Sequence, residues 1–148
     1  MAGKVLVFGG SGGIGGATAR QLARKGHTLH LVGRDSGRLQ ELAEETGATF
    51  GLADALEPSS IAQAVAAAGD ALSGLVYAVG SINLKPLGRL TPADFERDFR
   101  LNALGAALAV QAALPALKRH DGTSAVVLFS SVAVQQGFSA HASISMAK

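Results

Sequence analysis

The sequence contains no cysteine and no tryptophan, and only one of its 148 residues is a tyrosine. Without cysteine the chain can form neither a disulfide framework nor a thiolate metal site, and we expect no metal centre. The lack of cysteine agrees with a cytoplasmic location, which we therefore expect. Aromatic residues make up 5% of the chain, whereas alanine and glycine are abundant. Small side chains let helices lie close on a sheet, which favours a layered α/β architecture.

Charge and long apolar runs are scarce as well. Charged residues make up 16% of the chain and the formal net charge is +2, without any basic run, so we expect no nucleic-acid partner. No apolar stretch approaches the roughly 20 residues that a membrane-spanning helix needs, and no signal peptide is visible. We therefore expect no membrane partner. A P-loop kinase is excluded, because the phosphate-binding sequence GxxxxGKS/T does not occur.

Short apolar runs alternate along the chain with longer segments whose apolar residues recur at helical spacing. Strands are predicted at residues 4–8, 28–32, 48–52, within 72–79 and at 124–130. Helices are predicted at residues 13–25, from 35 or 36 to 46, at 58–68, and from 91 or 92 to about 120 with a break or kink. This order predicts a doubly wound, three-layer α/β fold with a parallel sheet and right-handed crossovers. No linker or repeat interrupts it, so we expect residues 1–148 to form one domain.

A glycine-rich loop, residues 9–16, joins the first predicted strand to the first predicted helix. A dinucleotide pyrophosphate needs backbone N–H groups at a helix N-terminus and nothing bulky in front of them. Two registers fit the loop: GxGxxG through Gly10, Gly12 and Gly15, and GxxxGxG through Gly9, Gly13 and Gly15. The strand before the loop and the helix after it favour a phosphate-binding loop over a flexible turn without a ligand.

The second register, so close to the N-terminus, resembles the short-chain dehydrogenase/reductase family, and the resemblance covers essentially the whole chain. It implies a Rossmann-type NAD(P)-binding domain. The cofactor-binding positions that it implies are Gly9, Ser11, Gly12, Gly13, Ile14, Gly15, Asp54 at the adenine, Gly80 and Lys148. Gly80 alone is kept from the family's Asn-Asn-Ala-Gly segment. The catalytic Asn, Ser and Lys of the family match Asn102, Ser131 and Lys148.

The choice between NADP and NAD depends on the residues that follow the second predicted strand. A carboxylate there accepts a hydrogen bond from the ribose 2′-OH of NAD, whereas an arginine accommodates the 2′-phosphate of NADP. The sequence places Gly33 at the usual acidic position and Arg34 next to it. We therefore expect NADP. The alternative is NAD, with Asp35 as the ribose ligand and Arg34 as a solvated surface residue.

The resemblance breaks at the proton-transfer residue. The family has a tyrosine four residues before its lysine, and that tyrosine exchanges a proton with the substrate. Position 144 is isoleucine here, which cannot transfer a proton. Tyr77 lies at the end of a strand, where nothing brings it to the missing position. His141 lies one helical turn before Ile144 and is a candidate acid, although a solvent-facing or loop-capping role suits it better.

Two functions follow. The first is an oxidoreductase that uses NADP, with NAD as the alternative, and transfers a hydride to or from a carbonyl or alcohol of a small-molecule substrate. The second is dinucleotide binding without turnover, as a sensor or structural protein. The family's last helices and strands do not follow Lys148, so we expect a fragment of a longer protein or a partner over the edge strand. The resemblance also implies a homo-oligomer.

Overall fold

The computed structural model describes residues 3–148. Its strands are β1 (Lys4–Phe8), β2 (Thr28–Gly33), β3 (Thr49–Leu52), β4 (Leu72–Tyr77) and β5 (Ala125–Leu128). Its α-helices are α1 (Gly13–Arg24), α2 (Ser36–Thr46), α3 (Pro58–Ala68), α4 (Pro92–Phe99), α5 (Gly105–Arg119) and α6 (Ala142–Ala147). Short 3₁₀ turns lie at Leu87–Arg89 and Val132–Val134, and a π-helical segment lies at Arg100–Leu104.

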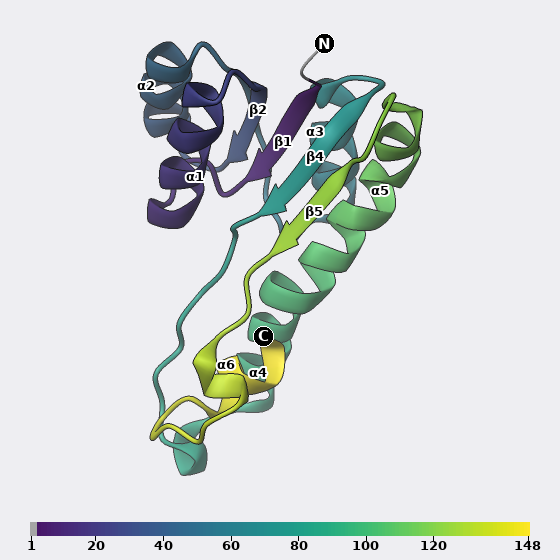
Figure 1. The fold of residues 1–148 in the computed structure, drawn as a ribbon. Helices are drawn as coiled ribbons and strands as arrows, with labels where there is room; N and C mark the ends of the chain where they lie inside the picture. Colours follow the sequence, from purple (N-terminus) through teal and green to yellow (C-terminus); the bar gives the residue numbers. More distant parts are fainter. Residues whose placement is uncertain (1–2) are drawn as a thin grey trace.

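The strands form one parallel sheet in the order β3-β2-β1-β4-β5, which confirms the predicted doubly wound fold. Helices α1 and α2 cover one face of the sheet, and α3 and α5 cover the other (Figure 1). The strand order reverses between β1 and β4, because the chain crosses from β3 back over β1 and β2. Helices α4 and α6 lie together beyond the carboxyl ends of the strands (Figure 1).

The protein has a hydrophobic core on each face of the sheet, and alternate residues of β1 pack into one or the other. Val5 and Val7 face α1 and α2, whereas Leu6 and Phe8 face α3 and α5, and all four are buried. A strand that is buried on both faces needs a continuous apolar run, as the sequence indicated. β5 differs from this pattern. It has only β4 as a neighbour, and its residues are exposed.

Helix starts follow the capping residues of the sequence. The Asp35 side chain accepts a hydrogen bond from the backbone N–H of Arg38 at 3.1 Å and caps α2, while Gly47, with φ +67°, ends it. Thr91 and Asp94 form a capping box at the start of α4. These side chains satisfy backbone groups that the helices leave unpaired.

The long predicted helix is interrupted as expected, although not at a proline. The π-helical segment separates α4 from α5, and the backbone N–H of Gly105 donates to the Arg100 carbonyl five residues earlier. The buried Tyr77 hydroxyl donates to the Leu101 carbonyl at 2.7 Å. Burial raises the pKa of this phenol. Tyr77 is thus a structural residue that ties β4 to the π-helical segment.

The helical stretch over residues 92–119, with the π-helical segment included, is long and apolar enough to cross a membrane by length and composition. This contradicts the expectation that no such segment exists. Helix α5 within it packs on α3 and β4, and Ala109 and Ala113 are fully buried there. The core helix of a soluble protein passes the same criterion, so the finding is weak evidence for a membrane.

The fifth strand is shorter than predicted. It ends at Leu128, so Ser130 and Ser131 lie in the following loop rather than at the strand end. The Ser131 hydroxyl accepts the backbone N–H of Ala133 at 3.2 Å and caps the 3₁₀ turn. The partner strand β4 ends at Tyr77, which pairs with Leu128, so the ladder of β5 ends there as well.

Gly105 is the tightest point between the sheet and the long helix. A β-carbon there would collide with the Tyr77 hydroxyl and lie 3.0 Å from the Ala55 carbonyl oxygen. We predict that Gly105→Ala lowers the free energy of unfolding by about 1–3 kcal/mol in urea denaturation. The matched control is Gly37→Ala in α2, where a β-carbon makes only an ordinary contact. The control is expected to raise the free energy of unfolding by about 0.5–1 kcal/mol. Equal effects of the two substitutions would contradict this interpretation.

His30 is a buried titratable group in β2. Its Nδ1 lies 2.8 Å from the Thr49 hydroxyl, and its Nε2 has no hydrogen-bond partner among residues 3–148. Burial lowers the pKa of His30, and the nearby Lys4 charge lowers it further. The folded chain therefore binds fewer protons than the unfolded chain once the pH falls below the ordinary histidine pKa of about 6.5.

We predict that this group makes the fold less stable in acid. Stability from neutral His30 is constant above about pH 6.5 and decreases as the pH falls further. In urea denaturation between pH 7 and pH 5, wild type should lose more unfolding free energy than His30→Asn, which keeps a polar group beside Thr49. Parallel pH profiles for the two proteins would show that His30 is not responsible.

Candidate functional site

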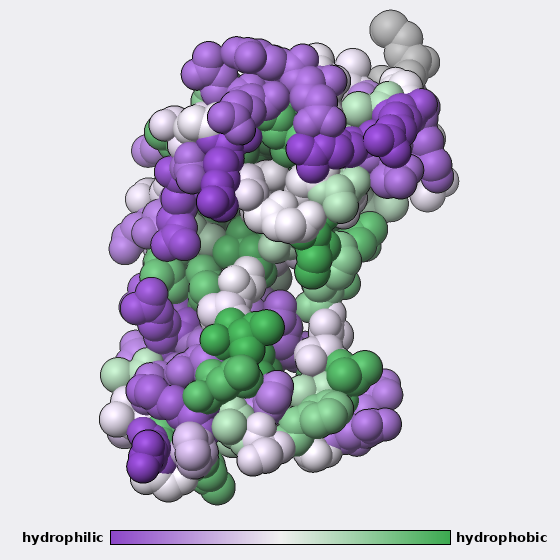
Figure 2. Space-filling model, turned by 90° about the vertical axis from the view of Figure 1, so that its left-hand side faces the viewer, coloured by the Kyte–Doolittle hydropathy of each residue, from purple (hydrophilic) through white to green (hydrophobic). Residues whose placement is uncertain are grey.

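The site lies at the carboxyl ends of the strands, where the strand order reverses between β1 and β4. In doubly wound sheets the loops diverge at this point and leave a crevice for a ligand. Two adjoining hollows occupy it, one on each side of the Gly9–Gly12 loop. On the surface that carries α1 and α2, hydrophilic residues dominate above and hydrophobic surface gathers below (Figure 2).

The glycine loop brings α1 close to the end of β1. Gly9 has φ +82°, a conformation that strains residues with a side chain. A β-carbon on Gly15 would collide with the Gly9 carbonyl oxygen. Two glycines of the GxxxGxG register therefore have different structural roles. Gly9 allows the turn, and Gly15 allows the close contact between strand and helix.

The N-terminus of α1 has no side-chain cap. Its N-cap residue is Gly12, and no acidic residue lies in the first turn. The first N–H groups of a helix have no partner within it, so they need an external acceptor. A β-carbon on Gly13 would meet nothing within 4 Å, so space lies in front of these groups. This cradle fits the pyrophosphate of a dinucleotide.

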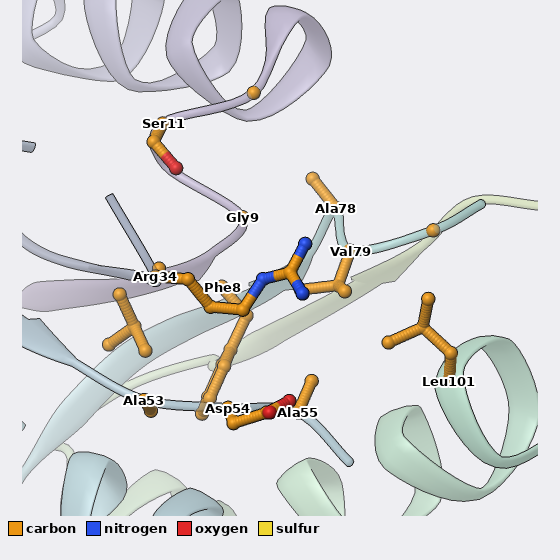
Figure 3. A pocket seen from close by; sticks show the side chains of 14 residues that line it. Phe8, Gly9, Ser11, Arg34, Ala53, Asp54, Ala55, Ala78, Val79 and Leu101 are labelled. Atoms are coloured by element: carbon orange, nitrogen blue, oxygen red, sulfur yellow. The ribbon is translucent and has the colours of Figure 1, made fainter. Parts of the chain in front are cut away.

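The first hollow, of about 160 Å³, lies between β1, β2 and the segment after β3. Its lining includes Phe8, Ser11, Arg34, Asp54 and Val79 (Figure 3). The Arg34 side chain extends into it between the glycine loop and the Asp54 segment (Figure 3). The Asp54 carboxylate accepts the backbone N–H of Leu56 at 2.9 Å, which holds this segment in a turn.

The residues around Arg34 differ in the interactions that they already make. The Asp35 carboxylate caps α2 and lies 3.5 Å from the Arg38 Nε atom. A β-carbon on Gly33 would lie 2.8 Å from the Ser11 hydroxyl oxygen, so a larger residue there would displace Ser11. Arg34 is exposed and makes no ion pair among residues 3–148.

The second hollow, of about 490 Å³, lies on the other side of the glycine loop. It is lined by the segments 12–14, 78–82 and 129–131, by Ile144 of α6, and by Lys148, which follows α6. Its surface is mainly apolar, and Ile14 and Ile82 are 56% and 74% exposed. Ser131, Ile144 and Lys148, which the resemblance singled out, thus share one cleft.

Lys148 is the cation of this cleft. It is partly buried, and that burial lowers the pKa of its ammonium group. A β-carbon on Gly80 would lie 2.9 Å from Lys148 Nζ and 3.1 Å from Asn102 Oδ1. Only glycine at position 80 therefore leaves room for the lysine and asparagine side chains beside the loop after β4.

Asn102 lies in the π-helical segment and is buried. Its side-chain Nδ2 donates to the Asp98 carbonyl at 2.9 Å and to the Ser81 hydroxyl at 3.3 Å. The backbone N–H of Ser81 donates to Asn102 Oδ1 at 3.4 Å. The asparagine thus connects the π-helical segment with the loop after β4. π-helical turns within α-helices occur frequently at functional sites.

Sequence reasoning missed a buried carboxylate behind the cleft. The Asp98 side chain is 2% exposed and accepts hydrogen bonds from the Ser81 hydroxyl at 3.0 Å and the Ser143 hydroxyl at 2.7 Å. The three residues come from α4, the loop after β4, and α6. A usable signal existed in the sequence, because Asp98 shares a helix face with Phe95 and Asn102, where an apolar residue is usual.

Two other candidates lie away from the cleft lining. His141 precedes α6, its ring Nδ1 lies 2.7 Å from the Ser139 carbonyl oxygen, and its ring packs on Phe138. It does not line the second hollow, in agreement with a loop-capping role. The Tyr77 hydroxyl is engaged with Leu101. In the part of the chain that the structure describes, no group of three or more His, Asp or Glu side chains could hold a metal ion.

Comparisons with known proteins agree with this architecture. The family model for short chain dehydrogenases matches residues 3–148. An uncharacterized oxidoreductase of Mycobacterium tuberculosis is 34% identical over 134 residues, which cover 86% of this chain and 50% of the relative. A solved short chain dehydrogenase/reductase family protein superposes with a TM-score of 0.91 at 30% identity, over 98% of this chain and 62% of its own.

A short chain dehydrogenase from Salmonella enterica serovar Typhi has a TM-score of 0.88 at 27% identity, and the match covers 100% of this chain and 65% of that protein. The chain thus spans about half the length of the mycobacterial relative and about two thirds of the solved structures. Family membership implies a nicotinamide dinucleotide cofactor. The family model, the relatives and the fold together assign the chain to the short-chain dehydrogenases, a family of oxidoreductases.

Proposed function

We propose that the chain is the dinucleotide-binding part of an oxidoreductase that interconverts a carbonyl and an alcohol with NADP(H). The observation that carries this proposal is the cleft in which the uncapped N-terminus of α1 faces Ser131 and Lys148. The helix end suits a pyrophosphate, whereas the Ser131 hydroxyl and the Lys148 ammonium suit a carbonyl or a ribose. The helix end and the two side chains lie at the crevice where the strand order reverses.

Each part of the dinucleotide has residues suited to hold it. The glycine loop, with Gly9, Ser11 and Gly12 to Gly15, would bind the pyrophosphate, and Asp54 would contact the adenine. Gly80 and Lys148 would border the nicotinamide ribose. When bound, the nicotinamide donates or accepts the hydride. Ser131 would orient the substrate carbonyl. Asn102 would hold the loop after β4 in place beside the cleft.

NADP is proposed over NAD because of the charge at the end of β2. Arg34 extends into the hollow that would hold the adenosine, and it is exposed and unpaired among the described residues. A guanidinium binds a phosphate well through two parallel hydrogen bonds. The competing ligand for NAD, the Asp35 carboxylate, already caps α2. An adenosine 2′-phosphate beside Arg34 would therefore be favoured.

Dinucleotide binding without turnover is the second candidate function. It is favoured by Ile144, which occupies the position of the proton-transfer residue and is 3% exposed in the cleft. In that case the protein would act as a sensor or structural subunit. His141 remains a proposed acid only if the segment before α6 rearranges, because its ring nitrogen is held by Ser139.

The remaining expectations are proposals as well. The mainly apolar cleft suits a small molecule with an apolar body beside its carbonyl. We propose that the protein acts in the cytoplasm without a nucleic-acid or membrane partner. We also propose that it forms a homo-oligomer, in accordance with the family resemblance.

We predict that Arg34→Ala weakens NADPH binding by about tenfold or more, because one charge-assisted contact to phosphate is lost. The affinity for NADH should change little, and calorimetry on the full-length protein measures both. The matched control is Arg24→Ala at the end of α1, which removes the same charge far from the hollow. Equal loss of NADPH and NADH affinity, or an equal effect of the control, would contradict the assignment to the 2′-phosphate. Absence of binding by wild type would overturn the proposed function.

We also predict that Gly13→Ala separates binding from folding. A β-carbon at position 13 would meet nothing within 4 Å among residues 3–148, so the melting temperature should not fall below that of wild type. The added methyl group would lie in the cradle at the start of α1, so NADPH affinity should fall about tenfold or more. A variant that binds NADPH as wild type does would show that the loop is a turn without a phosphate ligand.

A further inference from the structure

We propose that Ser81 and Asp98 form the proton-transfer pair of this cleft, in place of the tyrosine that Ile144 replaces. The inference rests on the proposed oxidoreductase function. Ser81 would contact the substrate oxygen, and Asp98 would exchange a proton with Ser81. The pair follows from the hydrogen bonds around the buried carboxylate.

Ser81 is placed to meet a substrate. It lines the second hollow together with Ser131, Ile144 and Lys148. It directly follows Gly80, whose position beside Lys148 Nζ brings this part of the loop next to the ammonium. Ser81 itself is partly exposed, so its hydroxyl combines access from the cleft with a buried partner.

The Asp98 carboxylate accepts hydrogen bonds but forms no ion pair with a cation among residues 3–148. Its two carboxylate oxygens accept hydrogen bonds from two hydroxyls, Ser81 at 3.0 Å on Oδ1 and Ser143 at 2.7 Å on Oδ2. None of the ion pairs found among residues 3–148 includes Asp98. A buried carboxylate without a cation behind a cleft is a candidate functional group.

Asn102 completes the arrangement. Its Nδ2 lies 3.3 Å from the Ser81 hydroxyl oxygen and donates to it, while that hydroxyl donates its own proton to Asp98. The Ser81 oxygen is therefore oriented from two sides. Its remaining lone pair is available to accept a proton from a third group in the cleft.

The proposed step balances in both directions. During alcohol oxidation, the substrate O–H proton moves to Ser81 Oγ while the Ser81 proton moves to Asp98 Oδ1, and a nicotinamide dinucleotide accepts the hydride from the carbinol carbon. The serine ends as it began, and the aspartate ends protonated. Carbonyl reduction is the reverse, with the Asp98 proton passing through Ser81 to the substrate oxygen.

A structural role for Asp98 is the rival explanation, because its bond to Ser143 attaches α6 to α4. Ser143 is fully buried and does not itself line the second hollow, so it offers a matched control. Ser143→Ala leaves one oxygen of the buried carboxylate without its donor, which lowers stability. It leaves the bond between Ser81 and Asp98 in place.

The test compares Asp98→Asn, Ser81→Ala and Ser143→Ala with wild type in the full-length protein. We measure NADPH affinity, melting temperature, and NADPH-dependent reduction of acetophenone, benzil and phenanthrenequinone, whose apolar bodies suit the cleft. Asp98→Asn and Ser81→Ala should lower turnover by about 100-fold or more while NADPH affinity stays within about threefold. Ser143→Ala should lower the melting temperature but keep most of the turnover.

One further readout separates proton transfer from structure. Adding Ile144→Tyr to Asp98→Asn should restore turnover at least about tenfold, since a phenol in the cleft supplies the missing acid.

Each contrary result decides against the pair. Unchanged turnover in Asp98→Asn, equal losses in all three variants, or no gain from Ile144→Tyr in the Asp98→Asn background would overturn it and leave the oxidoreductase function standing. NADPH binding without reduction of any of the three carbonyl compounds would overturn the pair and favour the non-catalytic function. No NADPH binding by wild type would overturn the proposed function itself.

Discussion

The close contact between the end of β1 and the start of α1 is the constraint on which the rest of the site depends. No side chain fits between Gly15 and the Gly9 carbonyl, so the helix begins directly above the strand. Its first N–H groups are thereby aimed into the crevice where the strand order reverses. The two hollows are the spaces on either side of this contact. The residues that line them come from the ends of all five strands, the start of α1, the π-helical segment, and α6 with Lys148.

Much of the fold could be predicted from the sequence because its signals are local. Continuous apolar runs mark β1 and β2, and the cap at Asp35 and the left-handed Gly47 mark the ends of α2. The early end of β5 could not be predicted in the same way. The ladder of β5 ends where its partner strand β4 ends, at Tyr77, and the local sequence of β5 carries no sign of that pairing.

Parts of the candidate site could likewise be predicted from local sequence, and other parts could not. The glycine loop, Arg34 and Lys148 carry a pattern in sequence, whereas the network of Ser81, Asp98 and Ser143 joins residues 17 and 45 positions apart. Hydrogen bonds of that range leave no pattern of their own in the sequence, although Asp98 stands on a helix face where an apolar residue is usual. Ile144 was visible at once as a departure from the family resemblance, but what surrounds it was not. The buried Asp98 carboxylate lies behind the cleft and is connected to it through the Ser81 hydroxyl.

The π-helical segment at Arg100–Leu104 has a consequence for how this chain tolerates change. Each residue of an α-helix turns the following ones by about 100°, so the extra residue of a π-turn sets the rotational phase between two helices. α4 faces α6 and carries Asp98, whereas α5 faces the sheet and buries Ala109 and Ala113. Loss of a single codon in this stretch would leave two sound helices but rotate one against the other. The reading frame of the gene would be preserved, but the cleft would no longer be aligned with the sheet.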